Sequence, residues 1–357
     1  MKQFWSSRIQ NLTPYVPGEQ PKNKVVKLNT NENPYPPSPK VLEAIRAATN
    51  QSLRMYPDPE GSRLREAVGE YYGLSMDQVF LGNGSDEVLA FCFQAFFSPG
   101  EPIVFPDITY TFYQVYCKLF DIPYQTIPLD HYFSVPVQAF CGDFKGVVLA
   151  NPNAPTGKAI PVCKIRTILE GNKNAVVLVD EAYVDFGGDS AVALIDNYPN
   201  LIVVKTMSKS RSLAGLRIGY ALGHPHLIEA LNCVKNSFNS YTLDRLALAG
   251  GEAAIRDDDY FRAMVAKVSL IRNRTATRLK KLGFCITEST SNFLFISHEK
   301  APARELFTFL RECGILVRYF DKPRIDNHLR VTIGTEEEMD LFCTAVQKIL
   351  EEQYHAI

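Results

Sequence analysis

The 357-residue chain lacks the features that mark membrane, secreted and nucleic-acid-binding proteins. It has no apolar run of 18 or more residues, the length that a membrane-spanning helix needs. Residues 1–15 contain no apolar segment of the kind found in a signal peptide. The net charge of −1 gives no electrostatic reason to expect nucleic acid or an anionic membrane as a partner. We therefore expect a cytoplasmic protein.

The chain also lacks a pattern of cysteines that would suggest disulfides or a metal. It has 8 cysteines, none of which forms a C-x-x-C pair. Several, such as Cys92 and Cys343, lie within apolar stretches. Cysteines of this kind are typical of small buried side chains in a reducing compartment, and not of a zinc site or a disulfide framework. We expect no metal.

The order of predicted elements indicates two domains and an arm. Residues 1–35 are polar and rich in proline, which is typical of an arm crossing the surface or a partner subunit. From Val41 helical patterns alternate with short apolar strands, at 103–105, 146–150, 175–179 and 201–204. Such strands are typical of a parallel sheet covered by helices on both faces. We predict an α/β fold with a large domain at 36–242 and a smaller α+β domain at 243–357.

The predicted strand ends supply different chemical groups, and ligands bind beyond the carboxyl ends of such strands. Gly82 and Gly84 precede a predicted helix, so the amides that follow them form a potential anion site. This is not a dinucleotide fingerprint, because Glu87 stands where a third glycine is needed. The Gly157-Lys158 pair is not a phosphate-binding P-loop, because Ala159 follows it.

Lys209 is the most informative of these groups. It follows the strand at 201–204 and stands near Thr206, Ser208 and Arg217. A single lysine at a strand end is ordinarily solvated, and Asp180 alone is more often a helix cap or a salt-bridge partner. Together these side chains suit a phosphorylated pyridine aldehyde, because a buried carboxylate against the pyridine nitrogen makes the ring a better electron sink. We therefore predict pyridoxal 5'-phosphate as the cofactor.

The motifs around these residues resemble those of the fold-type I pyridoxal-phosphate aminotransferases. The superfamily marks are Pro-Thr-Gly at 155–157, Asp-Glu-Ala-Tyr at 180–183, Ser-Lys at 208–209 and Gly-Leu-Arg at 215–217. Narrower marks resemble the histidinol-phosphate aminotransferases, and they lie at 12–15, 28–34, 56–59, 82–87 and 329–334. The resemblance implies the PLP-transferase fold and covers nearly the whole chain.

The resemblance also implies a role for each cofactor-binding residue. Lys209 would bond the cofactor aldehyde and move the substrate proton, and Asp180 would pair with the pyridine nitrogen. Tyr110 would stack on the ring, and Tyr183 would bond its phenolic oxygen. The implied phosphate ligands are Ser85, Asp86, Thr206, Ser208 and Arg217.

Other residues are implied to act on the substrate or across a dimer. Tyr15 would line the imidazole side of the pocket, while Arg330 and Arg318 would hold the substrate's phosphate or carboxylate. Tyr56 would reach the phosphate site of the neighbouring subunit, so that the active unit would be a homodimer.

The chain departs from the family pattern at one position. The asparagine that usually precedes Pro-Thr-Gly, and bonds the phenolic oxygen, is replaced by Ala154. Asn153 stands one residue earlier. Either Asn153 substitutes through a shifted turn, or Tyr183 makes that contact alone.

The implied reaction is transamination between L-histidinol phosphate and 2-oxoglutarate in histidine biosynthesis. Two related activities stay open on the same scaffold. One is an aromatic amino acid aminotransferase, in which a carboxylate replaces the phosphate. The other is a decarboxylase of the threonine-phosphate type, which would also need arginines that hold phosphate. A non-catalytic regulator is a third possibility, but the arm motifs begin at Leu12 and leave no room for a DNA-binding module before them.

Overall fold

A seven-stranded sheet forms the centre of the computed structural model, which describes residues 4–10, 12–23 and 25–354. In sheet order its strands are β2 (Val79–Asn83), β8 (Ile218–Gly223), β7 (Leu201–Thr206), β6 (Val176–Asp180), β5 (Gly146–Ala150), β3 (Ile103–Pro106) and β4 (Tyr124–Ile127). Only β8 runs antiparallel to its neighbours, and the remaining pairs are parallel. The predicted α/β fold with a mostly parallel sheet is confirmed.

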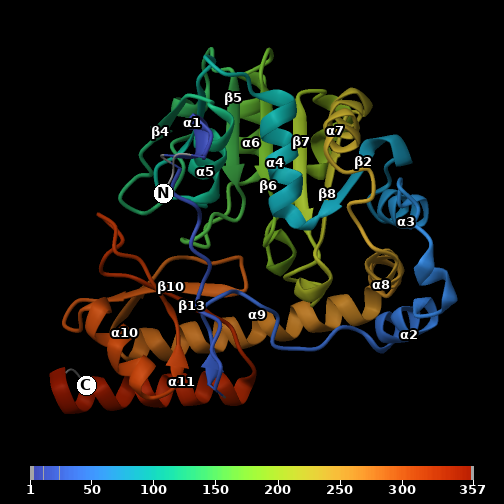
Figure 1. Ribbon diagram of the computed structural model, residues 1–357. Coiled ribbons are helices and arrows are strands. Elements are labelled where there is room, and N and C mark those ends of the chain that lie inside the picture. Colours follow the sequence, from blue (N-terminus) through green and yellow to red (C-terminus); the bar gives the residue numbers. More distant parts are fainter. Residues whose placement is uncertain (1–3, 11, 24, 355–357) are drawn as a thin grey trace.

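Helices cover both faces of this sheet (Figure 1). One face packs against α4 (Gly84–Phe96), α5 (Phe112–Phe120) and α7 (Pro225–Phe238). The other packs against α2 (Pro39–Ala48), α3 (Ser62–Tyr72), α6 (Val162–Glu170) and α8 (Arg245–Arg256). In β5, Val147 and Leu149 face the second layer, whereas Val148 faces the first. Burial on both sides explains why these strands are almost entirely apolar.

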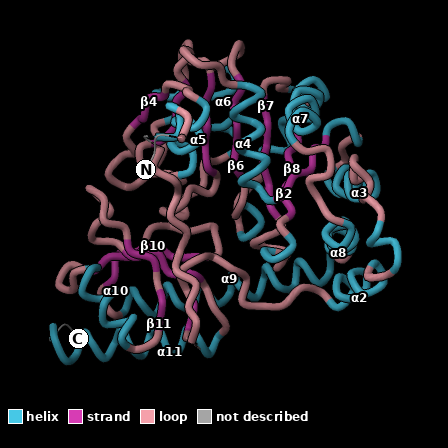
Figure 2. The backbone as a smooth tube through the Cα atoms, viewed as in Figure 1, coloured by secondary structure: helices cyan, strands magenta, loops and turns pink. Residues whose placement is uncertain are grey.

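A smaller α+β part lies below the sheet in Figures 1 and 2. Its four-stranded antiparallel sheet has the order β12 (Arg318–Tyr319), β13 (Leu329–Thr332), β10 (Phe293–His298) and β9 (Phe284–Ile286). Its helices are α9 (Asp258–Lys281), α10 (Ala303–Glu312) and α11 (Glu336–Ile349). The long helix α9 extends in Figure 1 from beside α8, below the large sheet, into the smaller part, and it connects α8 to β9.

The N-terminal arm completes the smaller part. After the short helix α1 (Ser7–Gln10), the strand β1 (Val26–Lys27) pairs in parallel with β11 (Ile315–Leu316). Leu28, at 0% exposure, packs in the same hydrophobic cluster as Val331 and Phe342. The arm was expected to pack on the small domain or on a partner subunit, and the contacts of Val26, Lys27 and Leu28 are with the smaller part.

Helix α8 packs against the large part, although it lies beyond residue 243, where the smaller domain was expected to begin. Ala247, Ala254 and Ile255 of α8 belong to the hydrophobic cluster under the large sheet, together with Val41 of α2 and Leu64 of α3. Beyond α8, the first buried residue of the smaller part's cluster is Val268 in α9. Side-chain packing therefore changes partners after Arg256, about one helix beyond residue 243.

Two local features are not apparent from the sequence. Helix α4 begins at Gly84, and Asn83 occupies its cap position without a side-chain hydrogen bond. The strand β8, which lies between β2 and β7, was not predicted. Its glycines, Gly219 and Gly223, weaken the strand pattern in the sequence. The described residues contain no helix with both the length and the apolar character that crossing a membrane requires.

Docking of the arm gives a first prediction. Leu28→Ala should lower the free energy of unfolding by about 2–4 kcal/mol, because it removes a fully buried side chain from a packed cluster. Urea unfolding of the purified protein measures this change. Val16→Ala is the matched control, since Val16 lies in the same arm but is 71% exposed. Equal stability of both variants would contradict the structural role of the arm.

Candidate active site

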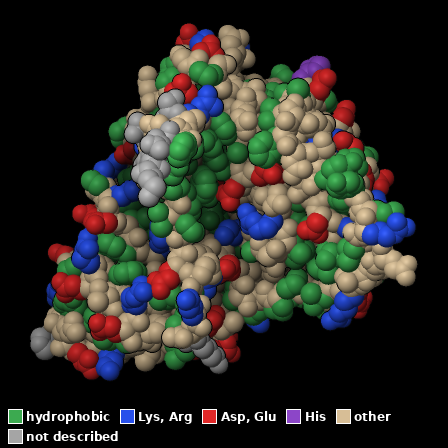
Figure 3. Space-filling model, viewed as in Figure 1, with side chains coloured by type: hydrophobic (Ala, Val, Ile, Leu, Met, Phe, Trp, Pro, Cys, Tyr) green, Lys and Arg blue, Asp and Glu red, His purple; other side chains and the backbone are tan. Residues whose placement is uncertain are grey.

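A cavity of about 690 Å³ lies where the carboxyl ends of the large sheet's strands face the smaller part. In Figure 3 a hollow is visible between the two parts, with Lys and Arg side chains at its edge. Most of the predicted site residues line this cavity, namely Tyr15, Ser85, Asp86, Tyr110, Asp180, Tyr183, Thr206, Ser208, Lys209, Arg217, Arg318 and Arg330. Residues far apart in the sequence therefore share one site, because parallel strands end at one edge of the sheet.

Lys209 lies inside the cavity, after the end of β7. Its Nζ donates a hydrogen bond to the backbone oxygen of Thr30 at 3.1 Å. It also lies 5.9 Å from the centre of the Tyr183 ring. Burial, together with the nearby charge of Arg330, lowers the pKa of Lys209 to about 8. A large fraction of this amine is therefore uncharged at mildly alkaline pH, as a nucleophile or a base requires.

Asp180 ends β6 and is only 6% exposed. Burial raises its pKa to about 6, although a hydrogen bond from Tyr113 acts in the opposite direction. The Tyr113 hydroxyl donates to Oδ2 at 2.8 Å, and the backbone N–H of Ala182 donates to Oδ1 at 3.2 Å. Tyr113 was not predicted as a site residue, because a tyrosine in an apolar helix has no distinguishing signal in the sequence.

An anion cradle forms at the start of α4. Gly84 has a φ of +80°, and a Cβ added there would lie 2.4 Å from Nη2 of Arg217. Only glycine therefore allows the guanidinium group to approach the first amides of the helix. Thr206 and Ser208 add hydroxyl groups, and the two hydroxyls are hydrogen-bonded to each other at 3.0 Å. This set of donors fits a phosphate group.

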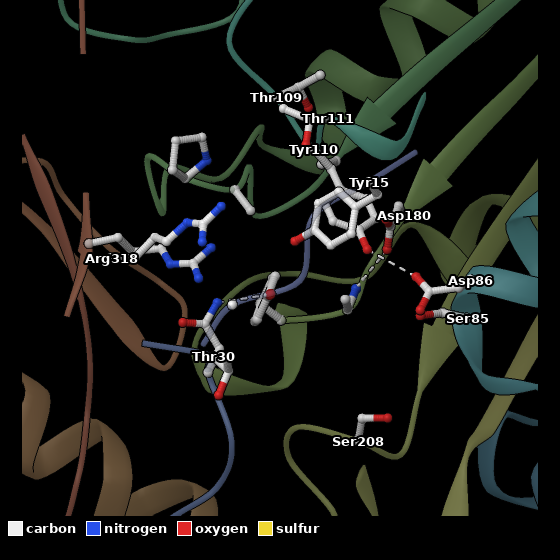
Figure 4. A pocket seen from close by; sticks show the side chains of 18 of the residues that line it. Tyr15, Thr30, Ser85, Asp86, Thr109, Tyr110, Thr111, Asp180, Ser208 and Arg318 are labelled. Atoms are coloured by element: carbon white, nitrogen blue, oxygen red, sulfur yellow. Dashed lines mark hydrogen bonds between the residues drawn. The ribbon is translucent and has the colours of Figure 1, made fainter. Parts of the chain in front are cut away.

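Aromatic rings form one wall of the cavity (Figure 4). Tyr110 donates from its hydroxyl to Oδ1 of Asp86 at 3.0 Å, and Tyr15 meets its ring edge-on at 6.0 Å between centroids. The Tyr183 hydroxyl accepts a hydrogen bond from Nδ2 of Asn31 at 3.0 Å. Asn31 lies in a predicted motif at 28–34, but no role had been predicted for it. Phosphate donors, a buried carboxylate, a lysine and aromatic rings in one cavity fit pyridoxal phosphate.

Three cations line the side of the cavity that belongs to the smaller part: Arg318, Lys322 and Arg330. Figure 4 shows Arg318 opposite Asp180 and Tyr110. Nη2 of Arg330 donates to the backbone oxygen of Asn29 at 3.0 Å, and burial lowers the pKa of its guanidinium group. None of the three forms a salt bridge with a carboxylate of the described residues. Lys322 was not predicted, because the resemblance assigned no role to it.

Two predicted residues do not line the cavity. Asn153 is 2% exposed, and its side chain is already engaged. Its Oδ1 accepts from Thr109 at 2.8 Å, and its Nδ2 donates to Ile108 and Thr156 at 3.0 and 3.1 Å. Because both hydrogens of its side-chain amide are already donated and the residue does not line the cavity, we do not propose Asn153 as a cofactor ligand. Tyr56 is 78% exposed and stacks on Tyr241, outside the cavity of its own chain.

The fold and the cavity define a pyridoxal-phosphate-dependent aminotransferase of fold type I. The family model "Aminotransferase class I and II" matches residues 23–346, so the chain belongs to this family. The described residues contain no group of three or more His, Cys, Asp or Glu side chains that could hold a metal ion.

The chain is also similar to individual proteins over nearly its full length. A histidinol-phosphate aminotransferase of Clostridium acetobutylicum is 54% identical over 351 residues, which cover 98% of this chain and 100% of the relative. One of Chromohalobacter salexigens is 53% identical over 349 residues, covering 98% and 99%. The solved structure of a Sinorhizobium meliloti histidinol-phosphate aminotransferase in complex with pyridoxal-5'-phosphate has a TM-score of 0.87 at 25% identity, covering 98% of each chain.

The raised pKa of Asp180 gives a second prediction, for the cofactor-free protein. An acid whose pKa is higher in the folded than in the unfolded state destabilises the fold as pH rises from the unfolded value towards the folded one. For a shift from 3.8 to about 6 this amounts to about 3 kcal/mol at pH 8 and roughly half of that at pH 5. Asp180→Asn removes this penalty, and its amide oxygen can accept from the Ala182 N–H while its NH2 group donates to the Tyr113 hydroxyl.

Asp180→Asn should therefore stabilise the cofactor-free protein, and more so at pH 8 than at pH 5. Thermal unfolding at the two pH values measures the difference. Asp189→Asn serves as the control, because Asp189 is exposed. A stabilisation that did not depend on pH would show that the carboxyl group is not buried as described.

Proposed function

We propose that this chain catalyses pyridoxal-phosphate-dependent transamination between L-histidinol phosphate and 2-oxoglutarate, giving imidazole-acetol phosphate and L-glutamate in L-histidine biosynthesis. The observation that supports this substrate best is the cation cluster of Arg318, Lys322 and Arg330, which faces the same cavity as Lys209. Arg318 and Arg330 are half-buried without a carboxylate partner among the described residues, so they favour an anion from the substrate, whereas Lys322 is exposed. Relatives above 50% identity that bear the name histidinol-phosphate aminotransferase support the same choice.

The residues at the strand ends would hold the cofactor. The first turn of α4 with Ser85, together with Ser208 and Arg217, would hold its phosphate. Asp180 would accept a hydrogen bond from the ring nitrogen, and Tyr110 would stack on the ring. When bound, pyridoxal phosphate supplies an aldehyde for the amino group and a ring that accepts electron density.

Lys209 would move the proton in this reaction. Its Nζ would take the proton from the Cα of the amino substrate, which its lowered pKa allows. Asp180 would stabilise positive charge on the ring nitrogen when it is itself ionised, above its pKa of about 6. Tyr15 would contact the imidazole side of the substrate, and its ring meets that of Tyr110 edge-on.

Arg318 and Arg330 would serve both halves of the reaction. A guanidinium group binds phosphate and carboxylate with the same pair of parallel hydrogen bonds. The phosphate of histidinol phosphate and a carboxylate of 2-oxoglutarate could therefore use one subsite in turn. Nε of Arg330 is buried without a hydrogen-bond partner in the described structure, so it has a donor left for such an anion.

We further propose a homodimer in which Tyr56 completes the partner's phosphate site. Tyr56, Leu53 and Met55 are exposed apolar side chains in one segment, and Tyr241 beside them is exposed as well. Adjacent exposed apolar side chains favour a protein interface. A cytoplasmic location is part of the same proposal, and the free state of all the cysteines supports it.

A comparison of amino donors tests the substrate. The purified holoenzyme, mixed separately with L-histidinol phosphate, L-phenylalanine and L-threonine phosphate, should lose its cofactor absorbance band rapidly only with histidinol phosphate. Arg318→Gln should raise KM for histidinol phosphate by about 100-fold, since it removes a bidentate partner of the phosphate, and should change KM for phenylalanine far less. Carbon dioxide release from threonine phosphate, or equal rates with phenylalanine, would contradict the proposal.

Mixing two inactive variants tests the dimer. Tyr56→Ala and Lys209→Ala each damage every site of a homodimer. A mixed dimer contains one site with both intact residues if Tyr56 acts across the interface. After exchange of subunits the activity should reach about a quarter of wild type, above the sum of the separate parents. Activity no higher than that sum would show that Tyr56 acts within its own chain or not at all.

A further inference from the structure

A buried lysine that does not line the cavity lies behind Asp180 and Lys209, the two principal residues of the site. Lys205 is in β7, inside the large sheet, and is 2% exposed. A lysine in such a place needs ionic partners, because an unpaired buried charge is strongly unfavourable. It is absent from the wall of the cavity, so its role is not direct contact with cofactor or substrate.

Lys205 is paired with two carboxylates. Its Nζ lies 3.1 Å from Oε2 of Glu181 and 3.4 Å from Oδ1 of Asp185. Burial alone would lower the pKa of Lys205, but the carboxylates of Asp185 and Glu181 raise it above its ordinary value. The ring of Tyr72, 5.4 Å from Nζ, covers the same group. The ammonium group is therefore charged and fixed from several sides.

Each carboxylate is connected to one of the principal site residues. Glu181 follows Asp180 directly in the chain, at the end of β6. Asp185 accepts a hydrogen bond at Oδ2 from the Ser210 hydroxyl at 2.5 Å, and Ser210 follows Lys209 directly. One ammonium group thus connects the strand end that holds Asp180 to the turn that holds Lys209.

We propose that Lys205 is a positioning residue, which fixes Lys209 relative to Asp180 through Glu181 on one side and through Asp185 and Ser210 on the other. This inference rests on the proposed function only in taking Lys209 and Asp180 as the residues that meet the cofactor. A displacement of about 1 Å between reacting groups can lower a rate by about 100-fold, so a fixed spacing has a large effect.

The alternative is a buried ion pair that only stabilises the fold, and two serine variants separate the possibilities. Ser210→Ala removes the hydroxyl that connects Asp185 to the Lys209 turn, without removing a charge. Ser190→Ala is the matched control. Ser190 donates to Oε2 of Glu181 at 2.6 Å and accepts from the backbone N–H of Val192 at 3.2 Å, away from the Lys209 turn. A purely structural cluster would be weakened by either change.

The experiment uses the cofactor-free full-length protein and pyridoxal phosphate. The rate of cofactor uptake is followed by absorbance between about pH 6 and pH 10, which brackets the titration of the Lys209 amine. Ser210→Ala should slow uptake by about tenfold and shift the midpoint of its pH profile, because the amine moves relative to Arg330. For Ser190→Ala the uptake rate should stay within about twofold of wild type, and the midpoint of its pH profile should not change. This should hold even if Ser190→Ala lowers the thermal unfolding midpoint as much as Ser210→Ala does.

Variants of Lys205 itself complete the test. Lys205→Met should slow uptake at least as much as Ser210→Ala, and Lys205→Arg should restore part of the rate because it keeps the charge. The proposal is overturned if Ser210→Ala and Ser190→Ala change uptake equally, or if Lys205→Met takes up cofactor at the wild-type rate. If Lys205→Met does not fold, the serine pair decides. None of these measurements uses an amino donor, so a wrong substrate assignment cannot imitate a failure here.

Discussion

Burial of charged groups at the carboxyl edge of the large sheet is the constraint on which the site depends. Removal from water shifts the pKa of Asp180 upwards, to about 6, and that of Lys209 downwards, to about 8. Both shifts come mainly from burial, and both favour the uncharged form of the side chain. Without a ligand, the burial of this acid and this amine therefore destabilises the folded protein.

The rest of the architecture serves to hold these groups in place without neutralising them by direct pairing. The carboxylate of Asp180 is hydrogen-bonded to Tyr113, and Lys209 Nζ to a backbone oxygen. Lys205 pairs directly with Glu181 and Asp185, and these three residues do not line the cavity. This arrangement lets the buried cluster fix the geometry while Asp180 and Lys209 stay available to ligand.

The agreement between prediction and structure varies with the range of the interactions involved. The strands at 146–150 and 201–204 are correct, because burial on both faces leaves an apolar signal in each segment. The strand β8 was missed because its glycines remove that signal. Asn153 was expected near the cofactor because it precedes the position of the family's asparagine, yet Thr109 and Ile108, more than forty positions away, engage its side chain. Lys322 lines the cavity because of the way the smaller part folds, which no local sequence pattern indicates.

The sequence by itself determined which chemical groups follow each strand, and these groups define the family and the cofactor. It could do so because a strand, its end and the following turn are local features with local signals. Only the tertiary structure decided which groups share a cavity, which are buried, and which are already engaged. Those properties depend on contacts such as Asn31 with Tyr183, or Lys205 with Asp185, between segments whose distance in space no local pattern records. The pKa shifts of Lys209 and Asp180 arise in the same way, since burial is a property of the assembled fold.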